Sequence, residues 1–162
     1  MTEACLLPEG RFEGREAFTG LVRQVFAVAA AQRWKQLVVC DPDFDDWPLG
    51  EAVVASSLND WARGGGRLVM LAARYDMVAR KHHRFVHWRG TWAHQIECRR
   101  LPGLDGGGSL MLAPVWVAER LDTERSTGIC SHHAARRVAV QERVAGWLPR
   151  SSPAFPATIL GL

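Results

Sequence analysis

Apolar side chains recur every three or four positions over residues 15–34, which predicts a helix with one apolar face. The residues that form this face are Phe18, Val22, Val25, Phe26 and Ala29. Residues 37–40 follow as a short, continuous apolar run that aspartate and proline bring to an end. Such a run is typical of a buried strand that leads into a loop.

The rest of the chain alternates between segments with the apolar spacing of a helix and segments with the pattern of a strand. After a short extended segment within residues 3–13, the pattern predicts helices over 49–63, 75–92 and 132–147, and strands over 67–72, 95–101, 109–118 and 126–130. The last two strands are expected to pair around residues 122–124. This alternation predicts one α/β domain over residues 1–162, a layered mixed sheet with helices on both faces.

The composition fits a globular protein, since 48% of the residues are hydrophobic and 23% are charged. No apolar stretch approaches the roughly 18 residues that span a membrane, and the first residues lack the pattern of a secretion signal. We therefore expect a cytoplasmic protein without a membrane partner. The cysteines form no CxxC pair, three of them fall in predicted strands, and all are expected to be reduced. They are Cys5, Cys40, Cys98 and Cys130.

Carboxylates gather in the loop that follows the first buried strand. The residues of this loop that are candidates for ligand binding are Asp41, Asp43, Asp45, Asp46 and Trp47. Ligands bind beyond the carboxyl ends of strands in open α/β sheets, and a divalent cation relieves the repulsion between clustered carboxylates. One hypothesis is a Mg²⁺ or Ca²⁺ site on Asp41 and Asp43, with Trp47 against the ligand. The alternative is a solvated turn in which aspartate caps the next helix.

The middle of the chain is basic, because residues 61–100 contain nine basic and two acidic side chains. In the helical segment 74–94, one broad face is predicted to belong to the core. This face consists of Val78, His82, Phe85, Trp88, Arg89 and Trp92. His83 and His87 lie four positions apart on the opposite face, where they are either a metal-binding pair or ordinary surface residues. The same segment is a candidate nucleic-acid site through Arg80, Lys81, Arg84 and Arg89.

A third candidate lies at the start of the last helix. Cys130 precedes Ser131, His132 and His133, so a thiol lies close to imidazoles at a strand-to-helix turn. A nucleophilic thiol with a histidine base is one hypothesis, with the helix N-terminus lowering the pKa of the thiol. The alternative is a buried strand cysteine followed by Ser131 as the helix cap.

The order of elements over residues 37–101 resembles one half of the phospholipase D-like fold, and the chain also resembles small bacterial proteins that are degenerate relatives of it. The stretch runs from Val-Val-Cys-Asp-Pro-Asp-Phe to Gln-Ile-Glu-Cys-Arg, with a histidine-rich helix between them. The family's catalytic His-x-Lys-x4-Asp motif is absent. The chain has two lysines, Lys35 and Lys81, and the residues two positions before them are Arg33 and Ala79 instead of histidine. The resemblance therefore implies the fold without the chemistry. It also implies a two-fold homodimer, since active members pair two such halves.

These observations favour a non-catalytic binding or interaction module. One alternative is a metal-dependent phosphoester hydrolase, with Asp41 and Asp43 as metal ligands and His83 or His87 as the acid or base. The other is a nucleic-acid-binding protein that uses the basic helix. No dinucleotide-binding or phosphate-loop glycine motif points to a nucleotide cofactor.

Overall fold

The computed structural model describes residues 6–106 and 108–156. Their strands form a single mixed sheet in the order β1-β7-β6-β5-β2-β3-β4-β8. The strands are β1 (Gly10–Phe12), β2 (Gln36–Cys40), β3 (Arg67–Ala72), β4 (Ile96–Arg100), β5 (Ser109–Leu112), β6 (Val117–Asp122), β7 (Thr127–Ser131) and β8 (Ser152–Pro153). Segments from the two ends of the described chain therefore form the two edges of the sheet.

Three parallel strands make up one half of the sheet. β2 pairs with β3, and β3 pairs with β4, each in parallel register. On its other side β2 pairs antiparallel with β5, which begins a meander through β6 and β7. The strand order thus reverses at β2, and ligands of open α/β sheets bind at such reversals, beyond the carboxyl end of the strand.

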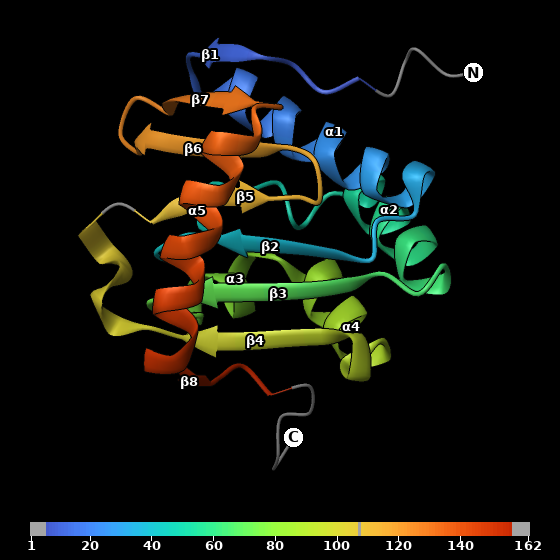
Figure 1. Cartoon of the computed structure of the whole chain (residues 1–162). Coiled ribbons are helices and arrows are strands. Elements are labelled where there is room, and N and C mark those ends of the chain that lie inside the picture. Colours follow the sequence, from blue (N-terminus) through green and yellow to red (C-terminus); the bar gives the residue numbers. More distant parts are fainter. Residues whose placement is uncertain (1–5, 107, 157–162) are drawn as a thin grey trace.

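Helices cover both faces of the sheet, as the sequence predicts (Figure 1). The helices on one face are α1 (Arg15–Gln32), α2 (Ala52–Arg63), α3 (Asp76–Lys81) and α4 (His83–Thr91), and α5 (Ala134–Trp147) crosses the other. Short 3-10 turns lie at Ala93–Gln95, Pro102–Gly106 and Leu148–Arg150. No helix within the described residues is both long and apolar enough to cross a membrane.

The two faces differ in how thoroughly they are covered. α1 buries the predicted apolar stripe, including Phe18, Val22 and Val25, against the sheet. α5, in contrast, buries only Val140 and Val144. Cys40, Cys98 and Cys130 are buried and unpaired, which confirms the prediction of reduced core thiols for them, while Cys5 lies outside the described residues.

Two predicted elements are split in the structure. The helix expected over 75–92 is two helices, α3 and α4, because His82 leaves the helical conformation with φ −111° and ψ 61°. The strand expected over 109–118 is a hairpin of β5 and β6, because Pro114 has no amide to continue a ladder and Ala113 N donates to Trp116 O across the turn. β6 then pairs with β7 as expected, with Asp122 opposite Thr127.

The apolar residues Phe155, Ile159 and Leu160 near the C-terminus predict a tail that packs across its own domain, and the described part of this segment does so. β8 pairs with β4, and Phe155 stacks on Tyr75 with the ring centroids 5.3 Å apart. Ile159 and Leu160 lie outside the described residues.

Candidate functional site

The aspartate loop, residues 41–47, begins where β2 ends, next to the point at which the strand order reverses. Asp41 holds the loop in shape, since its Oδ2 accepts hydrogen bonds from Phe44 N at 2.8 Å and Asp43 N at 3.2 Å. Phe44 adopts a positive φ of 56°. These contacts form a turn closed by an aspartate side chain, as the alternative interpretation of the sequence predicts.

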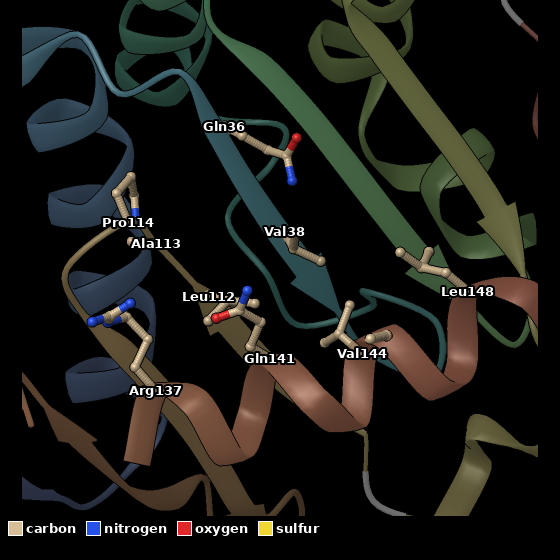
Figure 2. Close-up of a pocket in the computed structure, with 10 residues that line it drawn as sticks. Gln36, Val38, Leu112, Ala113, Pro114, Arg137, Gln141, Val144 and Leu148 are labelled. Carbon is tan, nitrogen blue, oxygen red and sulfur yellow. The ribbon is translucent and has the colours of Figure 1, made fainter. Parts of the chain in front are cut away.

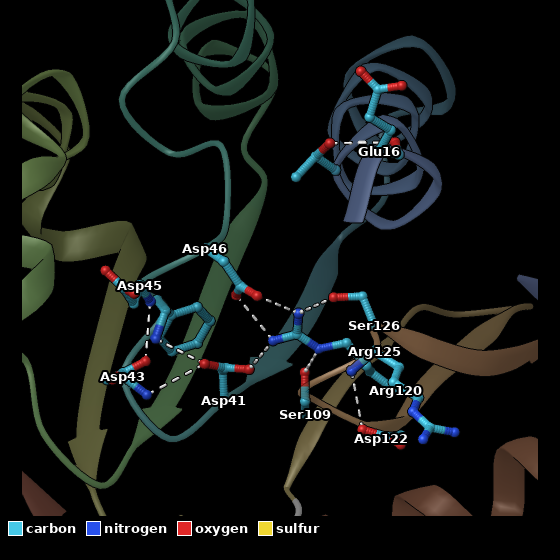
Figure 3. A network of polar contacts seen from close by, with 12 residues as sticks. Glu16, Asp41, Asp43, Asp45, Asp46, Ser109, Arg120, Asp122, Arg125 and Ser126 are labelled. Atoms are coloured by element: carbon cyan, nitrogen blue, oxygen red, sulfur yellow. Dashed lines mark hydrogen bonds and ion pairs between the residues drawn. The ribbon is translucent and has the colours of Figure 1, made fainter. Parts of the chain in front are cut away.

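Arg120 enters this loop from β6 and lies between two of its carboxylates (Figure 3). It donates to Asp41 Oδ1 at 2.9 Å and to both oxygens of Asp46 at 2.7 and 3.0 Å. Its remaining donors reach the hydroxyls of Ser109 and Ser126. The guanidinium therefore has every partner that a buried cation requires.

Burial and charge act in opposite directions on Arg120, whose side chain is 2% exposed. Burial lowers the pKa of the guanidinium, but the hydrogen bonds that it donates to Asp46 and the charge of Asp41 outweigh this effect and raise the pKa. The guanidinium carbon also lies 4.0 Å from the centroid of the Phe18 ring, which favours the cation further. Arg120 thus remains charged within the core.

The other two aspartates also have basic partners. Asp43 lies 3.5 Å from Arg74, and Asp45 forms an ion pair of 2.7 Å with Lys81. Arginine and lysine thus supply the counter-charge for which the sequence suggests Mg²⁺ or Ca²⁺. Within the described residues, no three metal-ligating side chains are grouped so that they could hold a metal ion.

Trp47 belongs to the core rather than to an open binding surface, which corrects its predicted contact with a ligand. Its side chain meets the rings of Phe18 and Phe44 edge-on, with centroids 5.4 and 4.7 Å apart. The residue is only 2% exposed. Although Trp47 borders a cavity of about 310 Å³, its indole therefore offers almost no exposed face on which a ligand could stack.

The face of segment 74–94 that was predicted to be buried is buried except for Trp92, which is partly buried, although the helix breaks at His82. This changes the interpretation of Arg89, which is 8% exposed and donates to the carbonyl oxygens of Ala93, Ile96 and Phe155. Arg89 therefore anchors the 3-10 turn and the C-terminal segment. Its proposed contact with nucleic acid is not compatible with this position.

The opposite face of the segment is exposed and carries Arg80, His83, Arg84 and His87. We call these four residues the basic surface. His83, Arg84 and His87 line a cavity of about 290 Å³ between α2 and α4, together with Asn59 and Trp88. The two histidines thus lie on one face, as predicted.

Asp41 and Asp43 line a different cavity of about 280 Å³, with Arg74 and Arg120. The structure therefore does not gather the aspartates and the His83–His87 pair into one site. The histidine that reaches the aspartate loop is His82, whose Nε2 lies 2.8 Å from Phe44 O.

Cys130 is not placed as a nucleophile. Its thiol donates to Gly10 O, and burial together with the charge of Glu9 raises its pKa to about 11. The expectation that the helix N-terminus lowers this pKa is therefore wrong. His132 and His133 instead lie beside Glu9, and Ser131 Oγ accepts from His133 N near the start of α5.

Sequence reasoning missed Arg120, the residue that organises the aspartate loop. The only signal in the sequence is a glutamate and an arginine, Glu119 and Arg120, in an otherwise apolar stretch. Two adjacent charges in a buried strand need partners on both faces of the sheet. The structure supplies them, with Arg136 and Arg143 on Glu119 and the aspartates on Arg120.

Comparisons with known proteins define the fold class. No family model matches the chain, and no curated protein matches it. A solved structure that it resembles is that of TrmBL2, described as an archaeal chromatin protein with a novel mode of DNA binding. The two share 11% identity at a TM-score of 0.62, over 93% of this chain and 56% of that one. The likeness is one of fold, so the protein is an α/β domain with a mixed sheet.

Proposed function

We propose that this protein is a non-catalytic nucleic-acid-binding domain that contacts phosphates through its basic surface. The observation that carries the proposal is the exposed position of Arg80 and Arg84 without a carboxylate partner among the described residues. Arg84 donates one hydrogen bond, from Nη1 to Gly50 O, which orients the guanidinium and leaves its charge unpaired. When unpaired surface arginines neutralise phosphates, the counterions condensed on the nucleic acid are released, which favours binding.

Three further observations support this function. His83 and His87 extend the polar face on α4, and Asn59 adds an amide beside them. The TrmBL2 structure, which has a similar fold, is described as binding DNA. The chain covers 56% of TrmBL2, so this description adds support to the proposal without locating a surface.

The alternative of a metal-dependent phosphoester hydrolase has less support. Asp41 and Asp43 are paired with Arg120 and Arg74, and they lie in a different cavity from His83 and His87. The membership in a phospholipase D-like family stays a prediction, as does the homodimer. The strand–helix–strand–helix–strand order over residues 37–101 agrees with that prediction.

The proposal can be tested by fluorescence anisotropy with a labelled duplex of about 20 base pairs at about 50 to 200 mM salt. The double variant Arg80→Gln, Arg84→Gln is expected to bind at least about tenfold more weakly. The slope of its log binding constant against log salt concentration is expected to be smaller by about two. The matched control replaces Arg125 and Arg150, which are exposed elsewhere, by glutamine. Equal losses in both double variants, or no binding at low salt, would overturn the proposal.

A further inference from the structure

A groove separates α5 from the sheet on the face opposite the basic surface (Figure 2). Its volume is about 320 Å³, which lies at the lower end of the range for small-molecule sites. Figure 2 shows Val38 of β2 and Val144 of α5 facing each other across it. The other apolar residues of its lining are Leu112, Ala113, Pro114, Ala145 and Leu148.

Two ion pairs and a small number of apolar contacts hold α5 on the sheet. Glu119 on β6 accepts from Arg136 at 3.1 Å and from Arg143 at 2.6 Å, so the helix is fixed at two points two turns apart. α5 buries only Val140, which lies between these points, and Val144, which follows the second of them. The sheet beneath the helix is therefore lined with apolar side chains that the helix does not fully cover.

Arg137 is the one arginine of α5 without an ion pair among the described residues. It lines the groove, and its Nε is buried without a hydrogen-bond partner. Leaving a buried charged donor unsatisfied costs free energy, so an acceptor at this position would be stabilising. Glu119 does not supply it, since its two oxygens accept from Arg136 and Arg143.

We propose that this groove binds an amphipathic monocarboxylate, with the carboxylate on Arg137 and the aliphatic body against Val38, Leu112 and Val144. A planar guanidinium matches a carboxylate in geometry. One unpaired positive charge is balanced by one negative charge, which favours a monocarboxylate over a doubly charged phosphate. Gln36 and Gln141, at the rim, provide further amide donors.

The site is independent of the nucleic-acid proposal, because α5 and the basic surface lie on opposite faces of the sheet. Octanoate is a suitable probe, since its chain is short enough for a small groove. Binding would be measured by calorimetry and located by the methyl NMR signals of Val38, Leu112 and Val144. A dissociation constant of about 0.1 to 1 mM is expected for a ligand of this size.

Two variants separate charge recognition from the apolar groove. Arg137→Gln is expected to weaken octanoate binding at least about tenfold, and the neutral 1-octanol is expected to bind similarly weakly to the unaltered protein. Ala145→Phe fills the groove from an exposed position of α5 and is expected to abolish binding in a protein that still melts cooperatively. Arg125→Gln, a control away from the groove, is expected to bind like the unaltered protein.

The proposal is overturned by any of three results. These are the absence of octanoate binding at several times the expected dissociation constant, an unchanged affinity in Arg137→Gln, and methyl shifts confined to residues outside the groove. Nucleic-acid binding would be unaffected in the Arg137 and Ala145 variants, so the two proposals can fail separately.

Discussion

Arg120 and Asp41 are 79 positions apart in the sequence, yet Nη2 of the arginine lies 2.9 Å from Oδ1 of the aspartate. Both side chains are only 2% exposed. The pair joins β6 to the loop that follows β2, and so connects the antiparallel half of the sheet to the parallel half. A pair of this kind contributes little net stability, but removal of one partner leaves an uncompensated buried charge.

Replacement of Arg120 by methionine is therefore expected to lower the free energy of unfolding by about 3 to 5 kcal/mol. The loss arises because Asp41 and Asp46 would remain without their shared cation. Urea denaturation at neutral pH measures it. The control is Lys81→Met, which breaks the exposed Lys81–Asp45 pair and is expected to cost less than about 1 kcal/mol. Equal stabilities of the two variants would contradict a central role for Arg120.

The free energy of unfolding is expected to decrease as the pH is lowered, because of His82. Burial lowers the pKa of this imidazole from 6.5, against the opposing effect of the hydrogen bond with Phe44 O. The unfolded chain therefore binds the proton more readily than the folded protein does. The contribution is complete above the unfolded-state pKa and is lost as the pH falls below it, by at most about 1.4 kcal/mol per pH unit.

The comparison of unfolding free energies at about pH 7.5 and pH 5.5 tests this expectation. His82→Gln, whose side-chain amide can donate to Phe44 O, is expected to lose less stability on acidification than the unaltered protein. His94→Gln, at an exposed position, is the control for the removal of an imidazole elsewhere in the chain. If His82→Gln and the unaltered protein lose the same amount, another group is responsible.

Gly128 is expected to tolerate no side chain. A Cβ at this position would collide with the carbonyl oxygen of Glu119 on the neighbouring strand and with the ring of Phe12. Gly128→Ala is therefore expected to destabilise the protein by about 1 to 3 kcal/mol in thermal or urea unfolding. Gly146→Ala is the control, because it lies in α5 with open space around it. That change is expected to be neutral or to stabilise the helix by up to about 1 kcal/mol.

The buried thiols are expected to be inert in the folded protein. Burial raises the pKa of Cys98 to about 11, and burial with the charge of Glu9 raises that of Cys130 to about 11. In a Cys5→Ser background, Ellman's reagent is expected to label no thiol rapidly in the native state and all three remaining thiols in denaturant. Rapid native labelling that a Cys130→Ser change removes would restore the hypothesis of a reactive Cys130.

Local spacing was sufficient to predict most elements and the buried face of segment 74–94. Val78, Phe85 and Trp88 are buried as their helical spacing predicts, even though His82 interrupts the helix. The interruption itself depends on a contact with Phe44, 38 positions away, which no local pattern contains. Element types follow from nearby residues, whereas breaks of this kind follow from tertiary contacts.

The chemistry of the aspartate loop could be predicted less well for the same reason. Four aspartates within six loop positions suggest a cation, but the sequence does not say whether the cation is a metal ion or an arginine. The strand order brings Arg120 to Asp41, and that order is decided by the packing of the whole sheet. Similarly, Arg136 and Arg137 are adjacent and chemically identical, and only the position of Glu119 distinguishes their roles.

The short strands at the two margins of the sheet affect how copies of the protein can meet. β1 has three residues and β8 has two, and Pro153 in β8 has no amide to donate. An edge this short offers few unpaired backbone groups to another chain, which protects the protein from strand-by-strand aggregation. Among the described residues, the two marginal strands therefore offer little backbone for pairing with a second copy, which favours association through the helical layers.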